Sequence, residues 1–231
     1  MATALPAPSG SVDFGRILRY PTEDPDWIKK LLIGGAFALL GSLLIGIPFV
    51  LGYFARTLNS VAQGATRLPE WDDLGGIFSE GLCLTAVYLV YALGMGLVIA
   101  VPMLAIIVPM GMLGERGGDA LGAVAGIGIV LVYGLVMLLS VALGVYLPAA
   151  LARAAVRGTI GDGFAVREVL AFIRANLGNY LLSLVIFLAA SFVAQFGLLL
   201  CCVGIFPATF WAYLVLAGGL GETVRLNPRS L

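Results

Sequence analysis

The chain has 231 residues, of which 61% are hydrophobic and only 11% are charged, and its mean hydropathy is +1.05. Soluble domains are about 45–50% apolar and about 25% charged, so this composition excludes an ordinary soluble protein and predicts an integral membrane protein. Thirteen basic residues balance thirteen acidic residues, which argues against a nucleic-acid-binding protein. The sequence has no histidine, the commonest general base and metal ligand.

The first segment, residues 1–12, precedes any apolar run. It has neither a basic start nor a hydrophobic centre, so it does not have the features of a secretory signal peptide and is predicted to be a disordered tail. A single transmembrane domain is predicted over residues 13–224, followed by a short C-terminal tail, residues 225–231.

Long runs without a charged residue predict the membrane spans, because one crossing needs about 20 apolar residues. Residues 31–55 form either one span or a hairpin, since Gly46-Ile47-Pro48 interrupts the run. Residues 175–221 would make a rod of roughly 70 Å, more than twice the hydrocarbon thickness, so this run is expected to fold back within 201–207. In the hairpin interpretation the spans cover 27–45, 47–62, 82–110, 121–150, 177–201 and 205–222.

The distribution of basic residues favours six spans over five. Six spans place all but Arg116 on one side of the membrane, whereas five spans divide the basic residues almost equally between the two sides. The residues that share a side are Arg16, Arg19, Lys29, Lys30, Arg56, Arg67, Arg153, Arg157, Arg167, Arg174, Arg225 and Arg229. Basic loops stay in the cytoplasm, so we expect three transmembrane hairpins with both termini cytoplasmic.

A weak repeat precedes the first span of each hairpin. An acidic residue, an apolar residue, two spacers and two apolar residues begin at Asp13, at Asp73 and at Glu168. The apolar positions share one face of a helix, which predicts cytoplasmic amphipathic helices in the membrane interface. These helices are expected over 13–20, 73–81 and 163–176. Chance is the alternative explanation, since short patterns of this kind arise easily in an apolar chain.

The predicted spans offer little chemistry. They contain no Asp, Glu, Lys or His away from their ends, so they lack the groups that mark proton relays. The three cysteines, Cys83, Cys201 and Cys202, are too few for a zinc or iron–sulfur site without histidine. We therefore expect neither a metal nor a cofactor. One set of small residues, Gly118, Gly122 and Gly126, is a candidate helix-packing face. It is expected to serve packing within the chain rather than contact with another subunit.

The most distinctive stretch is Leu68-Pro69-Glu70-Trp71-Asp72-Asp73, between the second and third predicted spans. Trp71 is expected to lie at the level of the headgroups, and Asp72 or Asp73 to cap the helix that begins near Leu74. The alternative is a cation or partner site formed by the three acidic residues Glu70, Asp72 and Asp73.

This stretch is the centre of a resemblance to a known family. Gly52-Tyr53-x-x-Arg56, Gly64, residues 68–74, Phe78, Gly81-Leu82 and Tyr91 together resemble the family labelled domain of unknown function 4013. The similarity continues through Glu168-Val169 and Asn176-x-x-x-Tyr180 and covers most of residues 14–222. The resemblance implies a multi-span protein of a prokaryotic cell membrane, and it implies no activity.

Three functions remain for such a chain. We expect a non-enzymatic accessory, scaffold or assembly subunit, whose partners are the lipid bilayer and other membrane proteins or a second copy. The alternative is a small channel or transporter for a neutral or apolar solute, because transporters often use interrupted helices. The weakest hypothesis is an enzyme that acts on lipid headgroups through Glu70, Asp72, Asp73 and Glu80.

Overall fold

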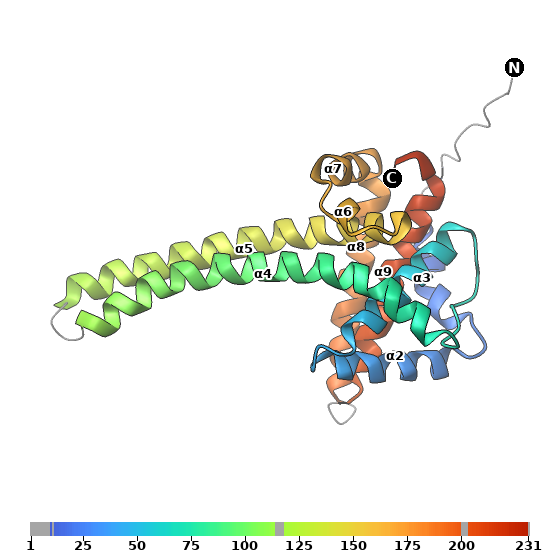
Figure 1. The fold of residues 1–231 in the computed structure, drawn as a ribbon, viewed down its shortest axis with the longest axis horizontal. Coiled ribbons are helices and arrows are strands. Elements are labelled where there is room, and N and C mark those ends of the chain that lie inside the picture. The colour runs from blue at the N-terminus through green and yellow to red at the C-terminus, as the bar shows by residue number, and fades with distance from the viewer. Residues whose placement is uncertain (1–9, 11, 114–117, 200–202, 231) are drawn as a thin grey trace, which may run out of the picture. The chain divides into compact units, whose positions relative to one another are not determined.

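The computed structural model describes residues 10, 12–113, 118–199 and 203–230. The described residues contain helices and no strands, which confirms the all-α prediction. The main helices, shown in Figure 1, are α1 (Phe14–Arg19), α2 (Trp27–Gly41), α3 (Ile47–Ala62), α4 (Leu74–Leu113), α5 (Gly118–Arg157), α6 (Ile160–Gly163), α7 (Val166–Ala175), α8 (Leu177–Gln195) and α9 (Ile205–Leu226). Short 3-10 turns cover Tyr20–Thr22, Phe196–Leu199 and Pro228–Ser230.

Local signals in the sequence explain where several helices begin and end. The carboxylate of Asp13 accepts hydrogen bonds from the first backbone N–H groups of α1, and that of Asp73 accepts one from Gly76 in α4. Pro48 lies in the first turn of α3, where its missing N–H costs no hydrogen bond. Gly64, with φ of +88°, ends the turn that follows α3.

Four helices are long and apolar enough to cross a membrane: Leu74–Val108 in α4, Gly122–Arg157 in α5, Leu177–Leu199, and Ile205–Leu226. The helices at the first two predicted spans are shorter, since α2 has 15 residues and α3 has 16. The protein is therefore an all-helical, multi-pass membrane protein by the length and composition of its helices.

One predicted element is wrong in its boundaries. The helix expected at 73–81 is not a separate interfacial helix, because α4 runs without a break from Leu74 to Leu113. Its predicted end rested on the charge of Glu80, and a single exposed glutamate does not interrupt a helix. The other two predicted interfacial segments coincide with α1 and its 3-10 turn, and with α7.

The chain divides into two compact units. The first contains residues 1–87 and 149–231, and the second contains residues 88–148. In the first unit, α9 packs against α8, α3 and α2 and is the most buried helix. Glycines allow this close packing, because a Cβ at Gly221 would lie 2.6 Å from the backbone oxygen of Leu58.

The first turns of α4 also touch α3 through glycines. A Cβ at Gly52 would lie 1.9 Å from the carbonyl oxygen of Ile77, and one at Gly81 would lie 1.7 Å from that of Pro48. No side chain fits between the two helices here, so the backbones themselves are in contact. This contact fixes the start of α4 and the end of the loop that precedes it.

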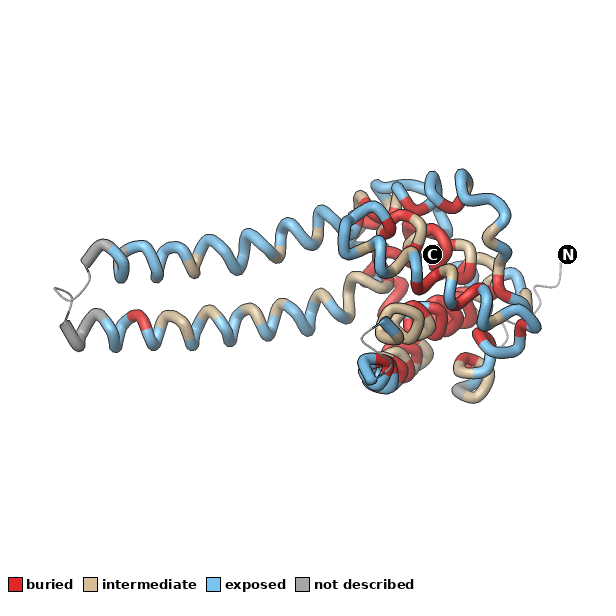
Figure 2. The backbone as a smooth tube through the Cα atoms, turned by 90° about the horizontal axis from the view of Figure 1, so that it is seen from below, coloured by how far each residue is buried: buried red, intermediate tan, exposed pale blue. Residues whose placement is uncertain are grey.

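The second unit consists of the remaining parts of α4 and α5. The hydroxyls of Tyr91 and Tyr146 lie 3.2 Å apart, and a Cβ at Gly128 would lie 3.2 Å from Ile106. Most other described residues of this unit are exposed (Figure 2). None of the most apolar stretch of α4 is buried inside the chain, and only 6% of that of α5 is.

Candidate functional site

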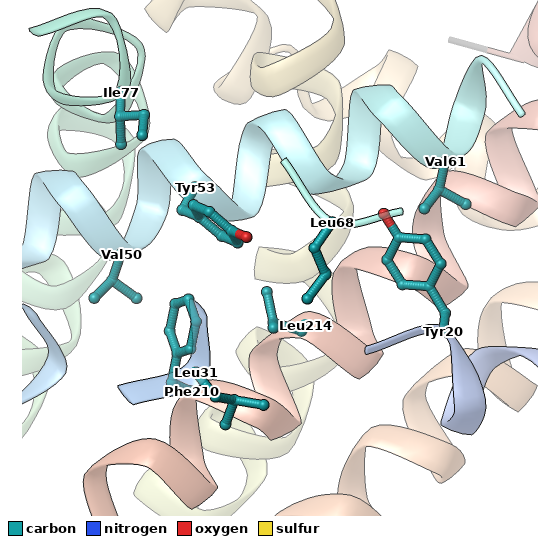
Figure 3. Packing of buried hydrophobic residues seen from close by; sticks show 9 residues of the cluster. All are labelled: Tyr20, Leu31, Val50, Tyr53, Val61, Leu68, Ile77, Phe210 and Leu214. Atoms are coloured by element: carbon teal, nitrogen blue, oxygen red, sulfur yellow. The ribbon is translucent and has the colours of Figure 1, made fainter. Parts of the chain in front are cut away.

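The loop between α3 and α4, residues 63–73, carries the sequence motif and is called the motif loop below. It crosses the first unit beside α2 and α3, and Leu68 enters the core between them (Figure 3). The phenol of Tyr20 donates to the carbonyl of Arg67, and that of Tyr53 donates to the carbonyl of Pro69, at 3.0 and 2.8 Å. Both tyrosines are buried, so the backbone of the loop is bonded to the core on its inner side.

A buried lysine is the centre of the polar contacts. Lys30 in α2 has a side chain that is only 4% exposed. Its ammonium lies 2.8 Å from the carboxylate of Asp24, 2.6 Å from that of Glu70 and 3.0 Å from the carbonyl oxygen of Leu68. An ammonium has three donors, and all three are used. Lys30 thereby joins the segment before α2 to the motif loop.

Asp24 is as deeply buried as its partner, at 2% exposed. Besides the bond from Lys30, its carboxylate accepts from the backbone N–H groups of Asp26 and Leu68, at 2.8 and 3.2 Å. Burial by itself raises the pKa of a carboxyl, but the bonds from Lys30 and the two amides outweigh it and hold the pKa of Asp24 below its usual range. The pair is thus ionised and internally satisfied at neutral pH.

The motif tryptophan belongs to an aromatic stack that is bonded to the backbone of Lys30. The Trp71 ring is stacked on Tyr53, with centroids 4.2 Å apart, and on Phe37, at 5.2 Å. Phe210 of α9 touches the same group, at 5.5 Å from Tyr53. The indole N–H donates to the carbonyl of Lys30 at 3.2 Å. Trp71 therefore connects α2, α3 and α9 to the motif loop. Its position at the level of the headgroups stays a prediction.

An arginine holds the other end of the motif loop. Arg56 of α3 donates to Glu80 through Nε and Nη2, at 3.0 and 2.9 Å, and to Asp73 through Nη2, at 2.7 Å. The Arg56 guanidinium and the amide of Gly76 keep the pKa of the Asp73 carboxyl below its usual range. Asp73 also caps α4, as one of the two residues predicted for that role. Arg56, expected inside a span, is thus neutralised by two carboxylates.

The acidic residues of the motif do not converge on one point. Glu70 binds Lys30, Asp73 binds Arg56 and the start of α4, and Asp72 is exposed. Within the described residues, no three metal-ligating side chains lie close enough together to hold an ion. The arrangement joins the chain to itself, and its chemistry is that of internal ion pairs and stacked rings.

A family comparison covers most of this architecture. A model of the family described as protein of unknown function, DUF4013, matches residues 35–203. The chain belongs to the DUF4013 family. No curated protein and no solved structure matches it. The DUF4013 match includes the motif loop, Arg56 and Glu80, whereas Asp24 and Lys30 lie before its first residue.

The second candidate site of this DUF4013 protein is the glycine face at the start of α5. A Cβ at Gly122 or at Gly126 would have no atom of the described residues within 4 Å, so neither glycine makes a close helix contact with that part of the chain. The surroundings of Gly118 are not described by the structure. Close glycine packing occurs instead at Gly52 and Gly81, which the sequence indicated as part of the family resemblance but not as packing residues.

Sequence reasoning also missed the buried ion pair. The sequence predicts only that Lys30 lies on the cytoplasmic side, and it predicts no contact for Asp24. The available signal was a pair of opposite charges six residues apart on either side of the start of an apolar helix. Their third partner, Glu70, is 40 residues away, a distance at which charge patterns in one sequence do not reveal a contact.

Proposed function

We propose that this DUF4013 protein is a non-enzymatic accessory, scaffold or assembly subunit of the prokaryotic cytoplasmic membrane. The observation that carries the proposal is the second unit, where α4 and α5 present long apolar surfaces that the chain itself leaves almost entirely uncovered. Exposed apolar surface of this extent is covered by lipid or by other proteins. The pair of helices is thus available to pack against neighbouring membrane proteins.

The motif supports a structural role over a catalytic one. The carboxylates of Glu70, Asp73 and Glu80 are each bound to a cation of the same chain. A general base or nucleophile must instead be able to reach a substrate, and a catalytic site needs partners that activate it. These carboxylates stabilise the junction of α2, α3 and α4, and the proposed function assigns them no chemical step.

A transport function receives less support. Pro48 lies in the first turn of α3 and Pro207 in that of α9, so these two prolines start helices, and α5 continues as a helix through Pro148. A cavity of about 510 Å³ is open and lined by residues between Pro25 and Ile33, at the start of α2. Flux assays on reconstituted vesicles test this alternative, and solute-selective flux above that of empty vesicles would favour it.

For the topology, we propose six spans in three hairpins with both termini in the cytoplasm, on the support of the basic residues. The short helices α2 and α3 raise one competing arrangement, in which they enter and leave the membrane from the cytoplasmic side. Both arrangements return the chain to the cytoplasmic side by the end of α3. They therefore place the same basic residues in the cytoplasm. The two topologies differ in the position of the turn between α2 and α3.

Cysteine labelling separates the two topologies. Ser42 is exposed in that turn, Thr66 is exposed in the motif loop, and Gly161 has open space around its Cβ position. In a chain whose native cysteines are replaced by serine, Ser42→Cys is expected to react with an impermeant maleimide from outside the cell. Thr66→Cys and Gly161→Cys are expected to react only after lysis. If Ser42→Cys does not react with the maleimide from outside, α2 and α3 enter and leave the membrane from the cytoplasmic side.

Photocrosslinking tests the scaffold role itself. A benzophenone amino acid is introduced at Val130 or Met137, both exposed on α5, and at Leu188, exposed on α8, as the matched position. We expect the α5 positions to crosslink the same protein partner reproducibly in native membranes, and Leu188 to crosslink it less. If all three positions yield only lipid adducts, the scaffold proposal is wrong.

A further inference from the structure

The helix α7 carries two neighbouring apolar rows, one buried and one exposed. Val169, Phe172 and Ile173 are buried and face the rest of the first unit. Val166 and Leu170 are exposed, at 52% and 38%. These two are four residues apart and therefore adjacent on one face of the helix. Packing within the chain accounts for the first row and leaves the second uncovered.

Two arginines lie beside the exposed row. Arg167 and Arg174 are both exposed and are separated by two helical turns, so they form a row of their own. At about 100° per residue, this row lies next to Val166 and Leu170 on the side away from the buried face. Neither arginine takes part in an ion pair among the described residues. The outer side of α7 is thus an apolar ridge bordered by cations.

The position of α7 is fixed at one end of α8 (Figure 1). Asn176 separates the two helices, and its buried amide donates to the carbonyl of Phe172 and to the hydroxyl of Ser230, both at 2.9 Å. The Phe172 ring meets Tyr180 of α8 edge-to-face at 6.0 Å. Because α8 is long enough to cross a membrane, its first residues lie near the headgroups, and α7 lies beside them.

We propose that the outer face of α7 binds anionic phospholipids. Val166 and Leu170 enter the boundary between headgroups and acyl chains, and the guanidinium groups of Arg167 and Arg174 donate to lipid phosphates. The inference rests on the proposed membrane topology, since it needs α8 to cross the bilayer. An apolar row beside a basic row is the pattern of a helix that lies in the interface. Guanidinium groups bind phosphate through paired N–H donors, and each adds about five-fold to the affinity for an anionic surface.

The depth of α7 is measured by spin labelling. The protein without native cysteines is labelled at Leu170→Cys, Glu168→Cys or Leu188→Cys and placed in vesicles of phosphatidylcholine and phosphatidylglycerol. We expect the label at Leu170 to collide more with oxygen than with a water-soluble nickel chelate, and the label at Glu168 to show the reverse. Leu188, exposed near the middle of α8, reports on the span.

These labels distinguish the two proposals. An oxygen-accessible label at Leu188 together with a nickel-accessible label at Leu170 would refute the binding of α7 to lipid and leave the span intact. A nickel-accessible label at Leu188 would refute the proposed topology as well.

Lipid retention tests the role of the arginines. The protein is extracted from the same mixed vesicles, and the retained phosphatidylglycerol is measured by mass spectrometry. Arg167→Gln with Arg174→Gln is expected to lower the affinity for phosphatidylglycerol by about 30-fold, and Lys at both positions to restore most of it. The matched control is Arg19→Gln with Arg67→Gln, two exposed arginines of the first unit that lie in α1 and in the motif loop. Equal losses in both pairs, or no loss in the first, would overturn the proposal.

Discussion

Replacing Lys30 by methionine isolates the contribution of the buried ion pair. Methionine keeps most of the length of the side chain and removes its charge. The change leaves the carboxylate of Asp24, 2% exposed, with two backbone N–H donors and no cation. It also leaves the carbonyl of Leu68 without its donor.

The burial of each partner determines the expected magnitude. Removing one member of a buried pair costs about 3–5 kcal/mol, because the remaining charge stays desolvated. Glu70 is 64% exposed, so its bond to Lys30 resembles a surface pair and Glu70→Gln is expected to cost no more than about 1 kcal/mol. We expect Asp24→Asn combined with Lys30→Met to recover at least about 2 kcal/mol of the loss, since no buried charge then remains.

The assay is unfolding by sodium dodecyl sulfate in mixed micelles, followed by tryptophan fluorescence, in which Trp71 reports on the stack beside Lys30. The matched control is Lys29→Met, an exposed lysine one position away, which is expected to change the free energy of unfolding by less than about 0.5 kcal/mol. If Lys30→Met is no more destabilising than Lys29→Met, the buried pair does not stabilise the protein and the reasoning fails.

Three further predictions concern the same junction. Trp71→Ala is expected to lower the free energy of unfolding by about 3–5 kcal/mol, and Trp71→Phe by about 1 kcal/mol. Phenylalanine keeps the ring stack and loses only the hydrogen bond to the carbonyl of Lys30, so equal losses of stability in the two variants would contradict this. Gly81→Ala is expected to cost at least about 1–3 kcal/mol, whereas Gly94→Ala in the same helix, with open space, is expected to be neutral or slightly stabilising by the same unfolding assay. The pKa of Asp24 is lower in the folded protein than its ordinary value of 3.8, so the unfolded chain binds the proton first as the pH falls. The stability that Asp24 provides is therefore complete above about pH 5 and lost at lower pH, and Asp24→Asn should flatten the dependence of the unfolding midpoint on pH; unchanged slopes would refute this.

Local signals in the sequence located several helices well. The bounds 47–62 match those of α3, because Pro48 and Gly64 mark its two ends by backbone constraints that act within a few residues. The predicted helix start near Leu74 matches that of α4, but the predicted division at residue 81 is wrong, since the charge of Glu80 does not interrupt the helix. The repeat shows the same limit. Asp13 and Asp73 both cap helices, but Glu168 lies inside α7.

The candidate site depended on contacts that a single sequence does not show. The motif residues were recognised, and Asp73 caps α4 in the structure. The hydrogen-bond partner of both Glu70 and Trp71 is Lys30 of α2, about 40 residues earlier. The burial of Lys30 results from the packing of α9 against α2 and α3. Charge patterns predict exposure for a residue such as Lys30, and only the tertiary fold makes its burial favourable.

The lengths of α4 and α5 have a consequence for the membrane around this protein. Each helix has 40 residues and measures about 60 Å, and the charge-free part of α4, residues 81–113, measures about 50 Å. A hydrocarbon layer of about 30 Å would need a tilt of about 53° to enclose that part, which is more than the usual range of up to about 40°. Tilt alone therefore leaves apolar surface outside the layer, and a kink of the helices or a local thickening of the bilayer has to accommodate the rest. Proteins with similarly long spans would gather in such a thickened patch, because each relieves the other's mismatch.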